Sequence, residues 1–331
     1  MPVASQPETT QKPARTAVRP PPDSRGVIIS LNPRAGSRSC HDRVQAIGQS
    51  LTRVGFSVRM TSDLDELTGL ATEGLDSGEL RVVLAVGGDG TASVVRNHVP
   101  LSVPMLPVPM GTENLLGRHV NQSIEPEEVC RTIVDGVVAG LDLCSANGKH
   151  FLLMVSAGFD AEVIRTLHEN RRGNITRRSY FLPTLRTIRS YGYPQMRLYS
   201  EEAGGASEPH SCRWLFGFNL PLYALGLPIA PDASATDGQL DVCTFNRGNV
   251  WSVMRYLWHV QRRAHAGLDD TVMLRNKRFR VEAHDSVKVP YQVDGDYGGT
   301  LPLNVEVLPG DLRLLVSRAA AERLGFVLPQ L

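Results

Sequence analysis

The sequence contains few cysteines, and none stand at a spacing that binds metal. Its 331 residues include five cysteines, scattered between Cys40 and Cys243 with no CxxC pair. This usage is typical of reduced structural thiols and offers no cysteine pair for a zinc site. We therefore expect a cytoplasmic protein.

The sequence also lacks strong net charge and a long hydrophobic run. Its net charge is +1 and 42% of its residues are hydrophobic, which is typical of a soluble globular protein and argues against a general nucleic-acid binder. The most apolar stretch, residues 214–230, is interrupted by Asn219, Pro221 and Pro228, so it is too short and kinked to cross a bilayer. The first 25 residues show no apolar core of a signal peptide. Any membrane association is expected to be peripheral.

Two common phosphate-binding motifs are missing as well. The chain contains neither GxxxxGK(S/T) nor GxGxxG, which excludes a P-loop and a dinucleotide fingerprint. Residues 82–95 instead read VVLAVGGDGTASVV, which predicts a buried strand, a glycine turn and a helix over residues 91–97. Bare glycines let backbone N–H groups approach an anion at a helix N-terminus. Asp89 in this turn either works with a metal ion at phosphate or, like Thr91, caps the helix.

The elements before residue 144 alternate between strand and helix. Strands are predicted at residues 27–31, 56–61, 82–86 and 103–108, and helices near residues 44–54 and 64–75. This order predicts a parallel sheet whose ligands lie at the carboxyl ends of the strands. The turns at residues 32–37, 87–91 and 109–114 would then share one rim.

The chain is predicted to contain three parts. Residues 1–25 carry six prolines and few large apolar residues, which predicts a disordered tail. Residues 26–144 form the predicted α/β nucleotide-binding domain. Residues 145–331 form a mainly β domain, with helices predicted near residues 161–169, 180–191 and 250–264.

An arginine-rich stretch lies inside the second domain. Between Arg165 and Arg197 there are eight arginines and one acid, Glu169, interleaved with aromatic residues. Such a stretch is either a solvated helical face or an interfacial surface that contacts a membrane. The sequence leaves both interpretations open.

Six short blocks occur in the order found in one family. They read NPRAG at residues 32–36, GGDGT at 87–91, PMGTEN at 109–114, AGFD at 157–160, DGQLDV at 237–242 and VDGD at 293–296. From Gly26 to the C-terminus the chain thus resembles the diacylglycerol kinase catalytic-domain family, which includes bacterial diacylglycerol kinases, YegS-like lipid kinases and sphingosine and ceramide kinases. GGDGT alone is shared with NAD kinases, whereas six blocks in register are specific.

The resemblance implies an ATP-dependent kinase that acts on a lipid hydroxyl, with Mg²⁺ at the phosphates organised by Asp89. It implies a second, structural metal site at Asp237 with the carbonyls of Ser234 and Gln239, and a general base at Asp296. The residues that would line the nucleotide are Asn32, Pro33, Arg34, Ala35, Gly36, Thr61, Gly87, Gly88, Asp89, Gly90, Thr91, Ala92, Ser93, Thr112 and Asn114.

Two positions depart from the family pattern. Asp296 is one methylene shorter than the usual glutamate, and Leu115 stands where many bacterial relatives carry a carboxylate of the metal network. Two other acids have plainer interpretations: we expect Asp160 to cap a helix and Asp294 to sit in an Asp-Gly hairpin turn.

The preferred prediction is therefore an α/β N-terminal domain with a parallel sheet, of the NAD kinase and diacylglycerol kinase type, plus a mainly β C-terminal domain. Its function would be to phosphorylate diacylglycerol to phosphatidic acid. The alternatives are a sphingoid-base or other lipid kinase, an NAD kinase relative and a non-catalytic nucleotide or lipid sensor. The expected partners are ATP, a lipid alcohol and a membrane surface, with a homodimer as an option and no nucleic acid.

Overall fold

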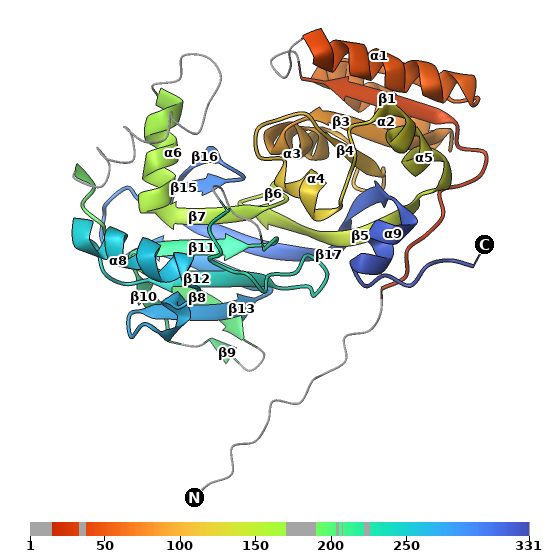
Figure 1. The fold of residues 1–331 in the computed structure, drawn as a ribbon. Helices are drawn as coiled ribbons and strands as arrows, with labels where there is room; N and C mark the ends of the chain where they lie inside the picture. Colours follow the sequence, from red (N-terminus) through yellow and green to blue (C-terminus); the bar gives the residue numbers. More distant parts are fainter. Residues whose placement is uncertain are drawn as a thin grey trace, which may run out of the picture.

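The computed structural model describes residues 15–32, 38–169, 190–202, 205–206, 208–221 and 226–330. The N-terminal half alternates strands and helices as expected (Figure 1). Its elements are β1 (Gly26–Leu31), α1 (Arg38–Arg53), β2 (Ser57–Thr61), α2 (Leu64–Asp76), β3 (Leu80–Gly87), α3 (Asp89–His98), β4 (Met105–Pro109), α4 (Leu115–His119) and α5 (Pro126–Asp135). The strands pair in parallel in the order β4-β3-β1-β2, which confirms the predicted parallel sheet.

Both faces of this sheet are covered by helices. On one face, Ile29 and Leu84 pack with Ile47 of α1 and Ile133 of α5. On the other face, Val83 and its neighbours pack with α2 and α3. Burial on both sides explains why the strands read as continuous apolar runs rather than as alternating patterns.

The C-terminal half is mainly β, as predicted, and its strands pair mostly in antiparallel register. Its elements are β5 (Val137–Ala146), β6 (Lys149–Phe151), β7 (Met154–Gly158), α6 (Phe159–Glu169), β8 (Met196–Glu202), β9 (Gly205–Ala206), β10 (His210–Cys212), β11 (Trp214–Phe218), β12 (Leu240–Phe245), α8 (Val250–Gln261), a 3-10 turn (His265–Gly267), β13 (Thr271–Asn276), β14 (Arg278–Ala283), β15 (Pro290–Val293), β16 (Asp296–Thr300), β17 (Leu303–Val316) and α9 (Arg318–Arg323). A six-stranded sheet, β13-β12-β11-β7-β15-β16, packs its apolar side against β8, β14 and the start of β17.

The two halves share one sheet through β5 and β17, which run from one half into the other (Figure 1). β17 pairs with β14 at its start and joins β4 in parallel at Leu314, while β5 accompanies it in antiparallel register. The predicted boundary at residue 144 therefore falls inside β5. The arginines Arg171, Arg172, Arg177 and Arg178 and most of the helix predicted at residues 180–191 lie outside the described residues. In the described part of the chain, no helix is long and apolar enough to cross a membrane.

Residues 15–25 pack against distant parts of the chain. The prediction of a disordered tail over residues 1–25 is therefore wrong for this segment. Thr16 bridges to Val327, Val18 bridges to Val138, and Ala17 is buried. The Arg15 guanidinium donates to Asp142 Oδ1 at 2.7 Å. These are backbone and charge contacts to distant parts of the chain, so a composition without large apolar residues did not indicate them.

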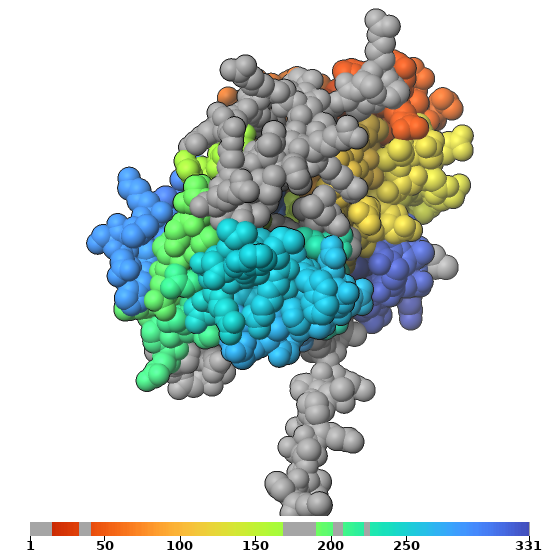
Figure 2. Space-filling view, turned by 60° about the vertical axis from the view of Figure 1, so that its left-hand side comes forward, coloured from red at the N-terminus to blue at the C-terminus, as the bar shows by residue number. Residues whose placement is uncertain are grey.

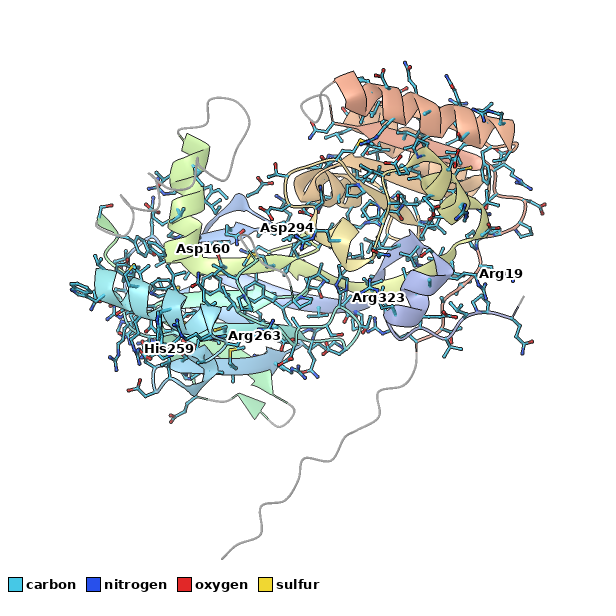
Figure 3. All side chains as sticks on the ribbon, viewed as in Figure 1. Arg19, Asp160, His259, Arg263, Asp294 and Arg323 are labelled. Atoms are coloured by element: carbon cyan, nitrogen blue, oxygen red, sulfur yellow. The ribbon has the colours of Figure 1, made fainter. Side chains whose placement is uncertain are left out.

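Arg15→Ala should lower the free energy of unfolding by about 3 kcal/mol, because Asp142 is fully buried and would lose its cation. Urea unfolding would measure the change. Arg19→Ala is the matched control, since Arg19 is exposed in the same segment (Figure 3). Equal stability of the two variants would mean that the Arg15 ion pair contributes nothing.

Candidate active site at the carboxyl edge of the parallel sheet

Three turns meet at the carboxyl ends of β1, β3 and β4, as the strand order predicts. Asn32, which follows β1, donates from Nδ2 to Thr91 Oγ1 at 3.1 Å. The Met110 N–H, after β4, donates to the carbonyl of Gly87 at 2.8 Å. The structure therefore brings parts of the NPRAG, GGDGT and PMGTEN blocks to one rim, while Pro33, Arg34, Ala35 and Gly36 lie outside the described residues.

The contact between the second and third turns requires glycine at position 111. A Cβ on Gly111 would lie 2.4 Å from Gly88 Cα, which leaves no room for any side chain. A Cβ on Gly90 would meet no atom within 4 Å, so the turn is open above that residue. Helix α3 begins at a Gly88 N-cap that has no side-chain hydrogen bond. Its first N–H groups thus start in a glycine turn without a capping side chain, which suits a bound anion.

Asp89 joins this turn to helix α4. Its Oδ2 accepts from Leu115 N at 2.9 Å and its Oδ1 accepts from Leu116 N at 3.0 Å. The helix that this carboxylate caps is therefore α4, not the helix that contains it. Burial raises the pKa of Asp89, and the N–H groups of Leu116 and Leu115 offset part of that rise. Leu115, one of the two positions that depart from the expected family pattern, contributes its backbone N–H here.

Three of the predicted nucleotide residues have places at the same edge. Asn114 adopts a left-handed conformation at φ 50° and accepts from Gly111 N at 2.8 Å, which shapes the third turn. Thr112 is exposed on that turn. Thr61 is the buried last residue of β2, and its hydroxyl accepts from Asp63 N at 3.0 Å and donates to Glu66 at the start of α2.

Helix α3 also connects the two halves of the chain. Asn97 Nδ2 donates to the His150 carbonyl at 2.9 Å, and His150 N donates back to Asn97 Oδ1 at 3.0 Å. One turn earlier in the helix, buried Ser93 favours the charged form of the Asp294 carboxylate and so lowers the pKa of that group. The GGDGT helix is therefore fixed at His150, two residues before Leu152, whose N–H Asp294 of the VDGD block accepts.

Asp294 has a role that sequence reasoning missed. The hairpin turn between β15 and β16 is present as predicted, with Asp294 at φ 51° and Gly295 at φ 86°. Its carboxylate, however, accepts N–H groups from Leu152 at 2.8 Å, Leu153 at 2.8 Å and Met154 at 3.1 Å. No local pattern indicates a contact across about 140 residues of sequence.

The neighbouring acid Asp160 is held in the same region. Ser156 Oγ donates to Asp160 Oδ2 at 2.6 Å, and Gln292 Nε2 reaches the same oxygen at 3.3 Å. Figure 3 shows Asp160 and Asp294 near one another, between α6 and the N-terminal half. Asp160 stands in the first turn of α6.

The Asp294 carboxyl should make stability depend on pH. Burial raises its pKa to about 6, although the three N–H groups and Ser93 favour the charged form. The folded protein then holds a proton that the unfolded chain releases near pH 4, so this residue's contribution to the free energy of unfolding falls as pH rises from about 4 to about 6. Urea unfolding would measure the free energy of unfolding of the wild type minus that of Asp294→Asn. This difference should be more positive near pH 4 than near pH 7. Asp76→Asn, at an exposed acid of α2, is the control for the loss of one carboxylate.

The predicted metal residues lie in the loop before β12. Asp237 Oδ1 accepts from Gln239 N at 3.0 Å, and Gly238 N donates to Asp142 Oδ2 at 2.7 Å. Ser234 stands at the start of this loop, where its hydroxyl pairs with that of Thr236 at 3.0 Å. Carboxylate and carbonyl oxygens are the ligands that Mg²⁺ and Ca²⁺ prefer. Among the residues that the structure describes, no group of three or more His, Cys, Asp or Glu could hold a metal ion.

Asp296 opens β16, opposite Val293, and is half-buried. It therefore lies two residues beyond Asp294, in the same hairpin.

Comparison with known families agrees with this arrangement. Residues 26–146 match the diacylglycerol kinase catalytic domain, and residues 153–316 match the YegS C-terminal NAD kinase beta sandwich-like domain. The chain belongs to the diacylglycerol kinase catalytic-domain family.

Its similar proteins cover nearly the whole chain. A diacylglycerol kinase of Bacillus subtilis is 25% identical over 312 residues, which is 89% of this chain and 98% of the relative. A diacylglycerol kinase of Staphylococcus epidermidis is 22% identical and covers 83% of this chain and 87% of its own. The crystal structure of a diacylglycerol kinase from Bacillus anthracis has the same fold, with a TM-score of 0.65 and 20% identity over 89% of this chain and 98% of that one.

Proposed function

We propose that this member of the diacylglycerol kinase family is an ATP-dependent lipid kinase that converts diacylglycerol to phosphatidic acid. The observation that carries the proposal is that two family blocks hold one segment of the chain: Asn97 of the GGDGT helix bonds to His150, and Asp294 of the VDGD hairpin accepts from Leu152 N. This shared segment joins a turn of the phosphate-binding type and a carboxylate-bearing hairpin at one junction. Phosphoryl transfer needs both a phosphate site and a group that accepts the alcohol's proton.

The nucleotide phosphates are proposed to lie over Gly88 and Gly90, where glycine backbone and the start of α3 can approach an anion. Asp89 fits a Mg²⁺ ion at this place, because the N–H groups that its carboxylate accepts do not use all of its lone pairs. Mg²⁺ neutralises charge on the phosphates when bound. The Asp89 contact with α4 would keep Thr112 and Asn114 beside the same phosphates.

Asp296 is proposed as the general base that accepts the proton of the lipid hydroxyl. Asp294 is the rival in the same hairpin, but its oxygens already accept three backbone N–H groups. The shorter reach of aspartate than glutamate would be made up by backbone placement or by a water molecule.

The Asp237 loop is proposed as a structural metal site. Added Mg²⁺ should raise the melting temperature of the wild type, because a ligand that binds only the folded state stabilises that state. At a hundredfold excess over Kd the free energy of unfolding would rise by about 2.7 kcal/mol. Asp237→Ala should abolish this rise, while Asp232→Ala, an exposed acid of the same loop, should keep it. Loss of turnover in Asp237→Ala with an unchanged Mg²⁺ effect on melting would assign the residue to the chemistry.

The proposed function is tested by incubating the protein with γ-labelled ATP, Mg²⁺ and a total lipid extract, and separating the labelled products. Label in phosphatidic acid supports the proposal, whereas label in another lipid would establish a different lipid kinase. Label transferred to NAD, in a parallel sample supplied with NAD, would favour an NAD kinase relative. ATP binding without any transfer would favour a non-catalytic sensor.

A further inference from the structure

Helix α8 packs only one of its faces into the protein. Val253, Tyr256 and Val260 are buried there, and the Tyr256 ring lies 4.3 Å from that of Phe245, centroid to centroid. Asn249 caps the helix by accepting from Ser252 N at 2.8 Å. The helix is therefore fixed in place by its inner face and its cap.

The outer face of α8 is apolar and exposed. Five of the fourteen exposed large hydrophobic residues in the described ranges belong to this twelve-residue helix: Val250 at 42%, Trp251 at 83%, Met254 at 58%, Leu257 at 40% and Trp258 at 52%. At 100° per residue they occupy one continuous arc of about 120°, opposite the buried residues. Figure 2 shows the cyan region that includes α8 on the side facing the viewer.

Positive charge borders this apolar arc. The helix contains no acid, and Arg262 flanks the arc on one side. Arg255 lies on the same side and is ion-paired with Asp270 at 2.9 Å and with Asp269 at 3.3 Å. The Arg262 guanidinium lies 3.8 Å from the centre of the Trp258 ring. From Arg247 to Asp270 there are four arginines and two aspartates. Arg247 and Arg255 pair with the two aspartates, so the excess positive charge of this segment is that of Arg262 and Arg263.

We propose that the outer face of α8, defined by Val250, Trp251, Met254, Leu257 and Trp258, docks on an anionic lipid bilayer. The inference rests on the proposed function only in that a lipid substrate would bring the protein to a membrane. Tryptophan has a large apolar ring with one polar N–H, which suits the boundary between headgroups and acyl chains, and arginine suits the phosphates above it. Twelve residues span about 18 Å, so the helix would lie in the plane of the interface and not cross the bilayer.

The test measures sedimentation with sucrose-loaded vesicles of phosphatidylcholine and phosphatidylglycerol. Trp251→Ser combined with Trp258→Ser should weaken vesicle binding about tenfold or more, the change that 1.4 kcal/mol gives. The control combines Val54→Ser with Met60→Ser, two exposed apolar residues of the N-terminal half, and should bind like the wild type. Arg262→Gln with Arg263→Gln should weaken binding to the anionic vesicles more than binding to phosphatidylcholine alone.

A second measurement locates the helix at the membrane. Phosphatidylcholine with brominated acyl chains should quench Trp251 and Trp258 in the wild type, while Trp214 is buried and should stay unquenched in the double tryptophan variant. Unchanged vesicle binding by that variant, or no quenching in the wild type, would overturn the proposal. A change in oligomeric state without a change in vesicle binding would also overturn it and assign the face to a second copy of the chain.

The outcome can be separated from that of the proposed function. Phosphorylation of a short-chain diacylglycerol below its micelle concentration should be the same in the wild type and the double tryptophan variant, because α8 contributes no residue to the candidate active site. Vesicle binding without transfer to any lipid would contradict the kinase proposal and leave the docking surface standing.

Discussion

Asp296→Asn should lower turnover by roughly 10²- to 10⁴-fold, on the order of 3–5 kcal/mol of barrier, because it removes a general base. Asparagine has nearly the same size, so the hairpin between β15 and β16 should form and ATP binding should change little. Steady-state turnover of diacylglycerol, with ATP affinity measured by calorimetry, would separate the two effects.

Asp296→Glu is the matched variant for this prediction. It restores the residue that the family usually carries and should retain far more activity than the asparagine variant. Near-normal turnover of Asp296→Asn, under conditions where chemistry limits the rate, would place the base elsewhere and make Asp89 or Asp294 the candidate.

Asp89→Asn should reduce both Mg-ATP affinity and turnover. Each carboxylate oxygen accepts a different N–H of α4, and an asparagine side chain has only one accepting oxygen. The variant would leave one backbone N–H facing an amide donor, at a cost of about 1–3 kcal/mol, and would release the third turn from the second. Calorimetry with Mg-ATP and a thermal melt would measure these changes.

Asp63→Asn is a close chemical control for Asp89→Asn. Asp63 caps α2 with a single oxygen, Oδ1, which accepts from Asp65 N and Glu66 N, each at 2.9 Å. Asparagine can keep both of those bonds, so this variant should bind Mg-ATP and turn over like the wild type. Equal losses in the two variants would show that the Asp89 effect is not specific to the junction of the turns.

Most of the N-terminal sheet could be predicted because its strands are buried on both faces and its helices have a clear apolar period. The glycine turn after β3 and the Asp294-Gly295 hairpin were also predictable, since these residue types have strong backbone preferences. The rim shared by three turns follows from strand order alone. Local pattern therefore indicated the elements, and topology rules placed the turns.

The missed features all depend on contacts between distant residues. Arg15 contacts Asp142, Leu314 of β17 joins β4 beside Met105, and Asp294 binds the amides at residues 152–154. The local sequence around each of these residues does not indicate which distant residue it contacts. The second oxygen of Asp89 is a similar case, because its partner is a backbone N–H that every residue except proline carries.

The most direct test offers purified protein γ-labelled ATP and Mg²⁺ with diacylglycerol vesicles, and with NAD in a parallel sample. Labelled phosphatidic acid should form with the wild type and fall by at least about 10² with Asp296→Asn, the general-base loss given above, while NAD stays unlabelled. Absence of labelled phosphatidic acid, or its undiminished formation by the Asp296→Asn and Asp89→Asn variants, would contradict the account.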